Sequence, residues 1–189
     1  MTKLCVIKTG QTTFEAESRI EPVTGSPLTA EGLQQIQNVA GQLASQGIGA
    51  IYAAGGQSEI ETASVVAEAL AVKVRREPDL HELDFGMWQG LTTGEIKRRQ
   101  PRKYRLWQDS PSKVRPPGGE TVDEAQERIR LALHGILKRH KATSPLLVLR
   151  PVAMVLLRSV VEEAAVEGMW RQMDPKFTWT SYEMADSQV

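Results

Sequence analysis

The chain has 189 residues, of which 41% are hydrophobic and 24% charged, and its formal net charge is zero. This length and composition suit one globular domain over residues 1–189, and the neutral balance gives no sign of a nucleic-acid partner or a membrane surface. Cys5 is the only cysteine, so an internal disulfide is excluded. With no apparent signal peptide and no apolar run long enough to span a bilayer, we expect a cytoplasmic protein.

Strand and helix signals alternate along the first half of the chain. Thr29 is placed to cap a helix that has one apolar face and ends at Gly47. Ser58 and Glu61 have the spacing of a capping box and predict a second helix, to about residue 71. Short apolar runs predict strands at residues 4–7, 50–54 and 72–74.

The second half begins with an irregular segment at residues 81–90, which reads H-E-L-D-F-G-M-W-Q-G. Residues 92–117 are rich in Arg, Lys and Pro, and they predict a helical excursion over the sheet rather than a linker between domains. Thr121 and Glu124 form another capping-box pattern, which predicts a long helix. The last predicted elements are a strand at 146–149, a helix from Pro151 to about residue 165, and a strand near 177–182.

This order of elements predicts an α/β fold, a three-layer sandwich in which helices cover both faces of a mostly parallel central sheet. In such folds ligands bind beyond the carboxyl ends of the strands. The loops that follow the strands at 4–7, 50–54 and 146–149 should therefore converge, with residues 81–90 lying across them. No polar residue of the first loop is an evident nucleophile or acid–base group at neutral pH: Lys8, Thr9, Gln11, Thr12 and Glu15.

Sequence blocks along nearly the whole chain carry a family resemblance. In order they read K-T-G-Q-T, L-T-x-E-G, I-Y-A-A with E-T-A, H-E-L-D-F-G-M-W-Q-G-L-T, P-P-G-G-E-T and L-L-V-L-R. Together they resemble the histidine phosphatase superfamily, and within it the cofactor-independent phosphatases related to phosphoglycerate mutase. The most specific signatures are the E-L-D-F-G-x-W-x-G and P-P-G-G-E-T blocks. The resemblance implies the fold of that family and no cofactor.

The resemblance also implies a role for each position of the site. In the family the first loop reads R-H-G-[EQ]-T-x-x-N and its His is phosphorylated, two Arg and a second His hold the phosphoryl group, and a Glu donates a proton to the leaving group. Imidazole is a competent nucleophile at neutral pH, and guanidinium groups match phosphate oxygens. Only the proton donor is retained among these catalytic groups, as Glu82. The replaced positions are Lys8 for the first Arg, Thr9 for the nucleophilic His, Glu15 for the Asn, Ser58 for the second Arg and Arg150 for the second His.

These replacements predict that phosphoryl chemistry is lost. The Thr9 hydroxyl would need a base to activate it, and a phosphothreonine ester would hydrolyse far more slowly than a phosphohistidine. Lys8 and Arg150 face Glu15 and Glu82, so the formal charges of the site positions cancel. We expect the two cations either to pair with these two carboxylates inside the cleft or to splay into solvent.

Three functional hypotheses remain open. The first is a catalytically inactive pseudophosphatase that binds a protein or a small molecule. The second is an enzyme with an altered nucleophile or altered chemistry that uses Glu82 as acid or base. The third is an anion-binding module built on Lys8, Arg150 and Gln11. The sequence does not choose the partner, and it permits a homodimer.

Other residue types give weaker signals. His81 adjoins Glu82 and is a candidate surrogate nucleophile, whereas His134 and His140 are expected on the surface of the long helix. No group of His, Cys or carboxylates has metal-ligand spacing. The basic stretch 97–103 is expected to be a solvated helix end rather than a nucleic-acid patch. Core or lid anchors are expected at the tryptophans, Trp88, Trp107, Trp170 and Trp179.

Overall fold

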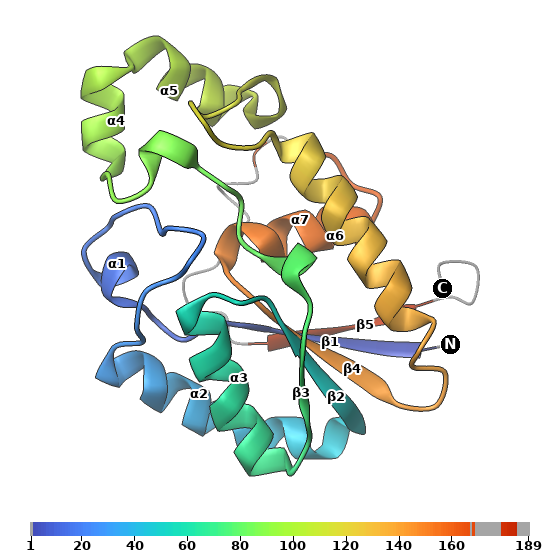
Figure 1. Ribbon diagram of the computed structural model, residues 1–189. Helices are drawn as coiled ribbons and strands as arrows, with labels where there is room; N and C mark the ends of the chain where they lie inside the picture. Colours follow the sequence, from blue (N-terminus) through green and yellow to red (C-terminus); the bar gives the residue numbers. More distant parts are fainter. Residues whose placement is uncertain (1, 167, 169–178, 185–189) are drawn as a thin grey trace.

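The computed structural model describes residues 2–166, 168 and 179–184. Its centre is a five-stranded sheet with the strand order β3-β2-β4-β1-β5 (Figure 1). β5 runs antiparallel to β1, and the other neighbouring strands are parallel. The predicted α/β architecture with a mostly parallel sheet is therefore confirmed. The strands are β1 (Thr2–Lys8), β2 (Ile48–Ala53), β3 (Val74–Arg76), β4 (Ser144–Leu149) and β5 (Trp179–Met184).

Helices cover both faces of the sheet, as predicted. The long ones are α2 (Ala30–Leu43), α3 (Gln57–Leu70), α6 (Val122–Leu137) and α7 (Pro151–Val161). Leu4 and Val6 of β1 belong to the core formed with α6 and α7, while Cys5 and Ile7 belong to the core formed with α2 and α3. Because successive strand residues point to opposite faces, one apolar run supplies both cores. Figure 1 shows the resulting three layers.

The predicted helical excursion over residues 92–117 lies beyond the strand ends, at the top of Figure 1. Its first helix begins at Thr92, as predicted, with a capping box whose partner is Glu95. Ile96 and Trp107 are buried in the same core as Trp88, so the excursion packs onto the domain. The remaining helices are α1 (Thr13–Ala16), η1 (Ala44–Gln46), η2 (Pro78–Leu80), η3 (Gly86–Trp88), α4 (Thr93–Arg99), α5 (Pro101–Asp109) and η4 (Pro111–Lys113).

Helix α3 begins differently from its prediction. Its N-cap is Gly56, which has no side chain with which to cap the helix. Ser58 lies inside the first turn, where its hydroxyl donates to Glu59, and Glu61 accepts the backbone N–H of Leu28. The capping-box prediction for Ser58 and Glu61 was wrong because neither side chain accepts a backbone N–H of the first turn of α3; Glu61 Oε1 instead accepts the side-chain amide of Gln57.

Other element boundaries also differ from those predicted: β1, β2 and β4 each begin two residues earlier than expected, and α2 ends at Leu43, before the short helix η1. β3 is displaced from 72–74 to Val74–Arg76, and all three of its residues are exposed on the edge of the sheet. α7 ends at Val161, earlier than residue 165. β5 begins at Trp179, while residues 177 and 178 lie outside the described residues, as does Trp170.

His140 lies past the end of α6 and is buried, so its expected place on the helix surface was wrong. Its ring nitrogens are 2.9 Å from the Tyr52 hydroxyl and 3.0 Å from the Thr143 hydroxyl, which lets a polar ring enter the core. Burial is the main cause that lowers the pKa of His140, and nearby arginines add to it. His134 is exposed, as expected.

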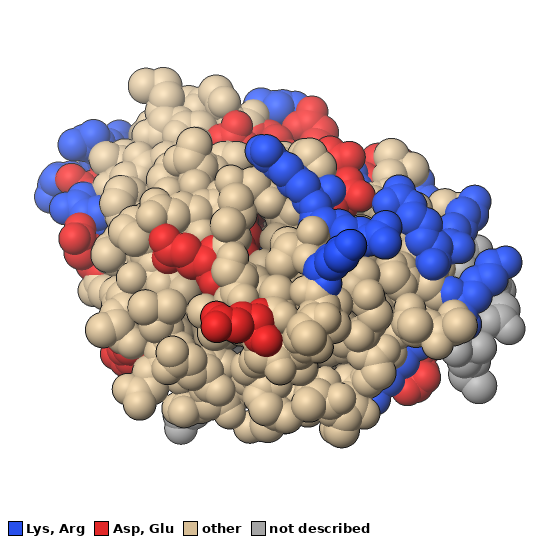
Figure 2. Space-filling view, turned by 60° about the horizontal axis from the view of Figure 1, so that its bottom comes forward, with Lys and Arg blue, Asp and Glu red and all other residues tan. Residues whose placement is uncertain are grey.

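Charged side chains are distributed unevenly over the surface. Arg75 and Arg76 lie on the open edge of β3, where charge disfavours pairing with another chain. Residues 97–99 are exposed in the last turn of α4, as expected for a solvated helix end. In Figure 2 the Lys and Arg side chains form a band toward the right and a smaller group at the left edge, and two groups of Asp and Glu side chains lie in the central area between them. Among the described helices, none is both long and apolar enough to cross a membrane.

Candidate functional site

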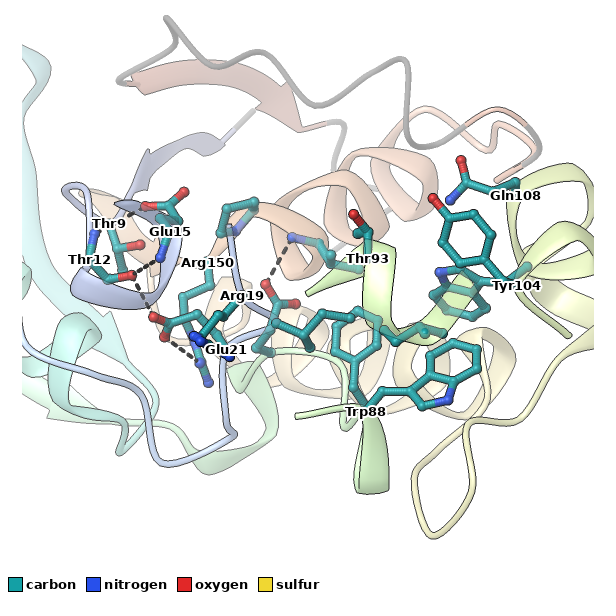
Figure 3. A pocket seen from close by; sticks show the side chains of 17 residues that line it. Thr9, Thr12, Glu15, Arg19, Glu21, Trp88, Thr93, Tyr104, Gln108 and Arg150 are labelled. Atoms are coloured by element: carbon teal, nitrogen blue, oxygen red, sulfur yellow. Dashed lines mark hydrogen bonds and ion pairs between the residues drawn. The ribbon is translucent and has the colours of Figure 1, made fainter. Parts of the chain in front are cut away.

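The loops after β1 and β4 meet at the carboxyl ends of the strands, where they border a cavity of roughly 250 Å³ (Figure 3). Thr9, Glu15, Glu82 and Arg150 line this cavity, so these predicted site residues are brought together. The predicted residues outside its lining are Lys8, Gln11 and Ser58. Among the described residues, no group of three or more His, Cys, Asp or Glu side chains is arranged to hold a metal ion.

Thr9 occupies the position that the resemblance assigns to the nucleophilic His. Its backbone N–H donates to the carbonyl of Leu149 at 2.9 Å, which ties the first loop to β4. The residue is 1% exposed, and its hydroxyl oxygen has no hydrogen-bond partner within the described part of the chain. No described side chain therefore holds this hydroxyl in the geometry that a general base requires.

Arg150 occupies the position of the second His and is 1% exposed. Its Nε donates to Glu59 Oε1 at 2.9 Å, and its Nη1 donates to Glu21 Oε2 at 3.3 Å and to the carbonyl of Pro22 at 2.6 Å. Its Nη2 donates to the carbonyl of Val23 at 2.7 Å. The guanidinium is thus held by the protein's own oxygens, and it fixes the loop that contains residues 21–23.

The neighbours of Arg150 are shaped to fit it. The Glu59 side chain is 0% exposed, and a Cβ at Gly56 would come within 2.3 Å of its Oε2. The Ser58 hydroxyl donates to that same oxygen at 3.2 Å. At the loop where the resemblance implies a phosphate-binding Arg, the chain therefore has a buried ion pair with matched small neighbours.

Glu82, the retained position, lies at the N-terminus of α7. Its Oε1 accepts the N–H groups of Leu83 and Ala153, each at 2.8 Å, and its Oε2 accepts the N–H of Val152 at 2.9 Å. The carboxylate thus takes the place at a helix N-terminus that favours an anion. Arg150 neither pairs with Glu82 or Glu15 nor extends into solvent, so both expectations for this cation were wrong: its hydrogen bonds go to other groups and it is buried.

The surroundings of Glu82 also change its acidity. Burial raises the pKa of Glu82 above its ordinary value of 4.5. The positive charge of Arg150 and the three backbone N–H bonds favour the ionised form, but they offset only part of this effect. A carboxyl group with a raised pKa beside a cavity is able to exchange a proton with a bound molecule.

Lys8 pairs with Glu15, one of the two carboxylates that the site cations were expected to meet. Lys8 Nζ lies 3.2 Å from Glu15 Oε1, with side-chain exposures of 14% and 27%. Glu15 Oε2 also accepts the N–H of Thr12 in the capping box of α1. Gln11 uses its Oε1 to accept the hydroxyl of Thr29 at 2.8 Å. Both cations suggested to bind an anion, Lys8 and Arg150, are therefore engaged with carboxylates of the protein.

An aromatic wall closes the other side of the cavity. It consists of Phe85, Trp88, Tyr104 and Trp107, and Figure 3 shows Trp88 and Tyr104 on this side. The ring of Trp107 meets those of Phe85 and Trp88 edge-to-face, with centroids 5.7 and 5.8 Å apart. Trp88 and Trp107 are core anchors, as expected. Because Tyr104 and Trp107 belong to α5, the excursion supplies part of the wall.

Sequence reasoning missed Glu21 and assigned Glu59 only to a helix start. Glu21 lies in a loop without periodicity, and its Oε1 accepts the hydroxyls of Thr12 and Ser26. The available signal was Arg150 itself, because an arginine at the end of a fully buried strand needs carboxylate partners. His81 does not line the cavity; its Nδ1 lies 2.7 Å from its neighbour's backbone carbonyl.

Comparison with known proteins defines the class. The profile of the histidine phosphatase superfamily (branch 1) matches residues 4–189, so the chain belongs to that superfamily. It is 34% identical over 158 residues to a bifunctional protein of Mycobacterium tuberculosis, covering 82% of this chain and 43% of that protein. It is 28% identical over 140 residues to phosphoserine phosphatase 1 of Hydrogenobacter thermophilus, covering 74% of this chain and 66% of that enzyme. The chain thus spans less than half of the mycobacterial relative.

A solved structure shows the same fold. YhfR of Bacillus stearothermophilus superimposes with a TM-score of 0.90 at 25% identity, covering 98% of this chain and 93% of YhfR. The resemblance to the phosphoglycerate mutase-like fold, first drawn from sequence blocks, is therefore confirmed.

Proposed function

We propose that this chain is a catalytically inactive member of the histidine phosphatase superfamily, whose cleft binds a ligand instead of transferring phosphoryl groups. One observation carries the proposal: the site's cations are neutralised by carboxylates of the protein. Arg150 is bonded to Glu21 and Glu59, and Lys8 is paired with Glu15. A phosphate would have to displace these partners.

The chemistry of the cleft supports the same proposal. Phosphoryl transfer through a covalent intermediate needs an activated nucleophile and donors aimed at the transferred group. Thr9 offers an alcohol without a hydrogen-bonded base among the described residues, and Glu82 already fills the N-terminus of α7. The Hydrogenobacter relative is named as a phosphatase. We propose that this chain shares the fold of that enzyme but not its reaction.

A second candidate function is favoured by Glu82. This carboxyl group borders the cavity and has a raised pKa, which suits an acid or base acting on a substrate other than a phosphate ester. The third hypothesis, an anion-binding module, has less support because both of its cations, Lys8 and Arg150, are engaged with carboxylates of the protein.

The test is turnover of p-nitrophenyl phosphate by the natural chain and by a restored variant. The variant carries Lys8→Arg, Thr9→His, Ser58→Arg and Arg150→His, together with Glu59→Ala. The last change is needed because Glu59 would otherwise be a buried carboxylate without its partner. We expect the natural chain to show no turnover and the restored variant to gain it.

A matched control separates the nucleophile from the rest of the site. It carries the same substitutions except that position 9 becomes Ala, and it should stay silent. Turnover by the natural chain would contradict the proposal, and turnover that survives Thr9→Ala would in addition require another nucleophile.

A further inference from the structure

We propose that the cavity binds a small organic ammonium ion with an apolar body, placed between Glu82 and Thr9 on one side and the aromatic wall on the other. This inference rests on the proposed function, in which the cleft binds a ligand without phosphoryl transfer. Three features support it: the excess of carboxyl groups over cations at the strand ends, the Thr9 hydroxyl without a hydrogen-bond partner in the described chain, and the aromatic wall.

The carboxylates at the strand ends outnumber the cations that neutralise them. Lys8 forms an ion pair with Glu15, and Arg150 forms ion pairs with both Glu21 and Glu59. In the described chain, the hydrogen bonds of the Glu82 carboxylate come from backbone N–H groups. Four carboxyl groups thus face two cations, and a bound ammonium ion would favour the ionised form of Glu82 and balance its charge. The groups counted are Glu15, Glu21, Glu59 and Glu82 against Lys8 and Arg150.

Arg19, the other cation in the lining, does not change this balance. Its Nε lies 2.9 Å from Glu17 Oε2, and its Nη1 lies 3.8 Å from Glu95 Oε2. Its Nη1 also donates to the carbonyl of Gly90 at 2.8 Å. With two carboxylates of its own, Arg19 leaves the cavity without a surplus cation for an anionic ligand.

The Thr9 hydroxyl gives an independent indication of a ligand. Buried polar atoms in folded proteins nearly always have a hydrogen-bond partner. Thr9 is 1% exposed and lines the cavity, yet its Oγ1 has no partner in the described chain. The hydroxyl oxygen is able to accept a hydrogen bond from an ammonium N–H, while Glu82 supplies the charge.

The wall suits the other end of such a molecule. Phe85, Trp88, Tyr104 and Trp107 present aromatic surface to the cavity, together with apolar residues such as Ile20. Aromatic faces attract cations, and their area also accepts an apolar body. An anion of the same shape would gain the apolar contact, but it would meet repulsion from the carboxylates.

The experiment uses three ligands of one shape that differ in charge: benzylamine, benzyl alcohol and benzoate. Binding is measured by calorimetry and by NMR shifts of the indole N–H groups of Trp88 and Trp107 at neutral pH. We expect benzylamine to bind about tenfold more tightly than benzyl alcohol, a difference typical of a desolvated charge and cation–π contact. Benzoate should bind most weakly.

Two variants test the placement of the ligand. Glu82→Gln should bring the affinities for benzylamine and benzyl alcohol close together, whereas Glu68→Gln, on the exposed side of α3, should leave their ratio unchanged. Thr9→Val keeps the side-chain shape and should weaken benzylamine binding even if Glu82→Gln fails to fold. An unchanged ratio in folded Glu82→Gln, or unchanged affinity in Thr9→Val, would overturn the placement.

The outcomes separate this inference from the proposed function. If benzoate binds as tightly as benzylamine, or if benzylamine does not bind, the proposed class of ligand is wrong. The proposed lack of catalysis would still stand in that case, provided that the natural chain does not turn over p-nitrophenyl phosphate. If the natural chain turns over that phosphate through the cleft, the proposed function fails, and the inference that rests on it fails as well.

Discussion

Two regions near the strand ends differ in the physical constraint that determines which residue types they accept. In the crossing segment, by which we mean residues 81–90 together with residues 117–119 that pack on them, backbone lies directly against backbone. A Cβ at Gly119 would come within 2.2 Å of the Asp84 carbonyl oxygen, and a Cβ at Gly86 would come within 2.3 Å of the Pro117 carbonyl oxygen. Gly86 also has a φ of +49°, which side chains disfavour. Close backbone packing and the positive φ therefore require glycine at these positions, independently of the chemistry of the site.

The loops at the strand ends follow another rule, because their side chains face a cavity and each other. Arg150 and Glu59 form a compensated pair, and Gly56 leaves space for the carboxylate. A set of such residues is exchangeable as long as its charges and volumes match. The sequence blocks that identify this family therefore reflect backbone packing, whereas the chemistry of the site depends on a separate set of side chains.

The largest expected effect comes from breaking the buried pair. Arg150→Met leaves Glu59 without its cation at 0% exposure, and we expect a loss of about 3–5 kcal/mol in the free energy of unfolding. Urea denaturation measures it. Lys8→Met is the control, because the pair with Glu15 is partly exposed, and it should cost no more than about 1 kcal/mol. Equal losses in the two variants would contradict the distinction between the buried and the exposed pair.

A somewhat smaller effect is expected in the crossing segment. Gly119→Ala forces a Cβ against the Asp84 carbonyl oxygen, and such overpacking costs about 1–3 kcal/mol. Gly41→Ala is the matched control, because nothing lies within 4 Å of its added Cβ in α2, and alanine should stabilise that helix by up to about 1 kcal/mol. If Gly119→Ala also stabilised the protein in urea denaturation, the crossing segment would not be fixed by close packing.

The sequence predicted much of the fold because many of its signals are local. Thr29, Thr92 and Thr121 each cap the helix that they were expected to begin. The same kind of signal failed at Ser58, where the side chain serves the buried pair instead. The predicted surface position of His140 was wrong because helix periodicity does not show that the Tyr52 hydroxyl lies in the core as its hydrogen-bond partner.

The candidate site could be predicted only in part. The replaced positions, such as Thr9 and Arg150, come together as expected, and the pair between Lys8 and Glu15 joins residues close in sequence. The partners of Arg150 could not be predicted, because Glu21 is 129 residues away in a loop without periodicity. Long-range partners in irregular loops depend on the tertiary arrangement, which no local pattern encodes.

The smallest effect, and the one that sharpens the role of the retained residue, is a pH dependence at Glu82. Its pKa is raised above 4.5, mainly by burial. Between 4.5 and the folded-state pKa, the folded protein keeps a proton that the unfolded chain has lost. The contribution of Glu82 to stability is therefore fully present below pH 4.5 and is lost as pH rises through the folded-state pKa.

Glu82→Gln removes this titration. Its carbonyl oxygen is able to keep the bonds from Leu83 and Ala153, while its amide nitrogen faces the N–H of Val152, at a cost that does not depend on pH. The Tm of the natural chain minus that of Glu82→Gln should therefore fall as pH rises from 4 to 8. Surface carboxylates with lowered pKa values, such as Glu124 at about 2, are common to both proteins and cancel in the difference. A difference that stays flat or rises with pH would show that the backbone N–H bonds outweigh burial, and Glu82 would then be an ordinary ionised cap of α7 rather than a proton-exchanging group of the cavity.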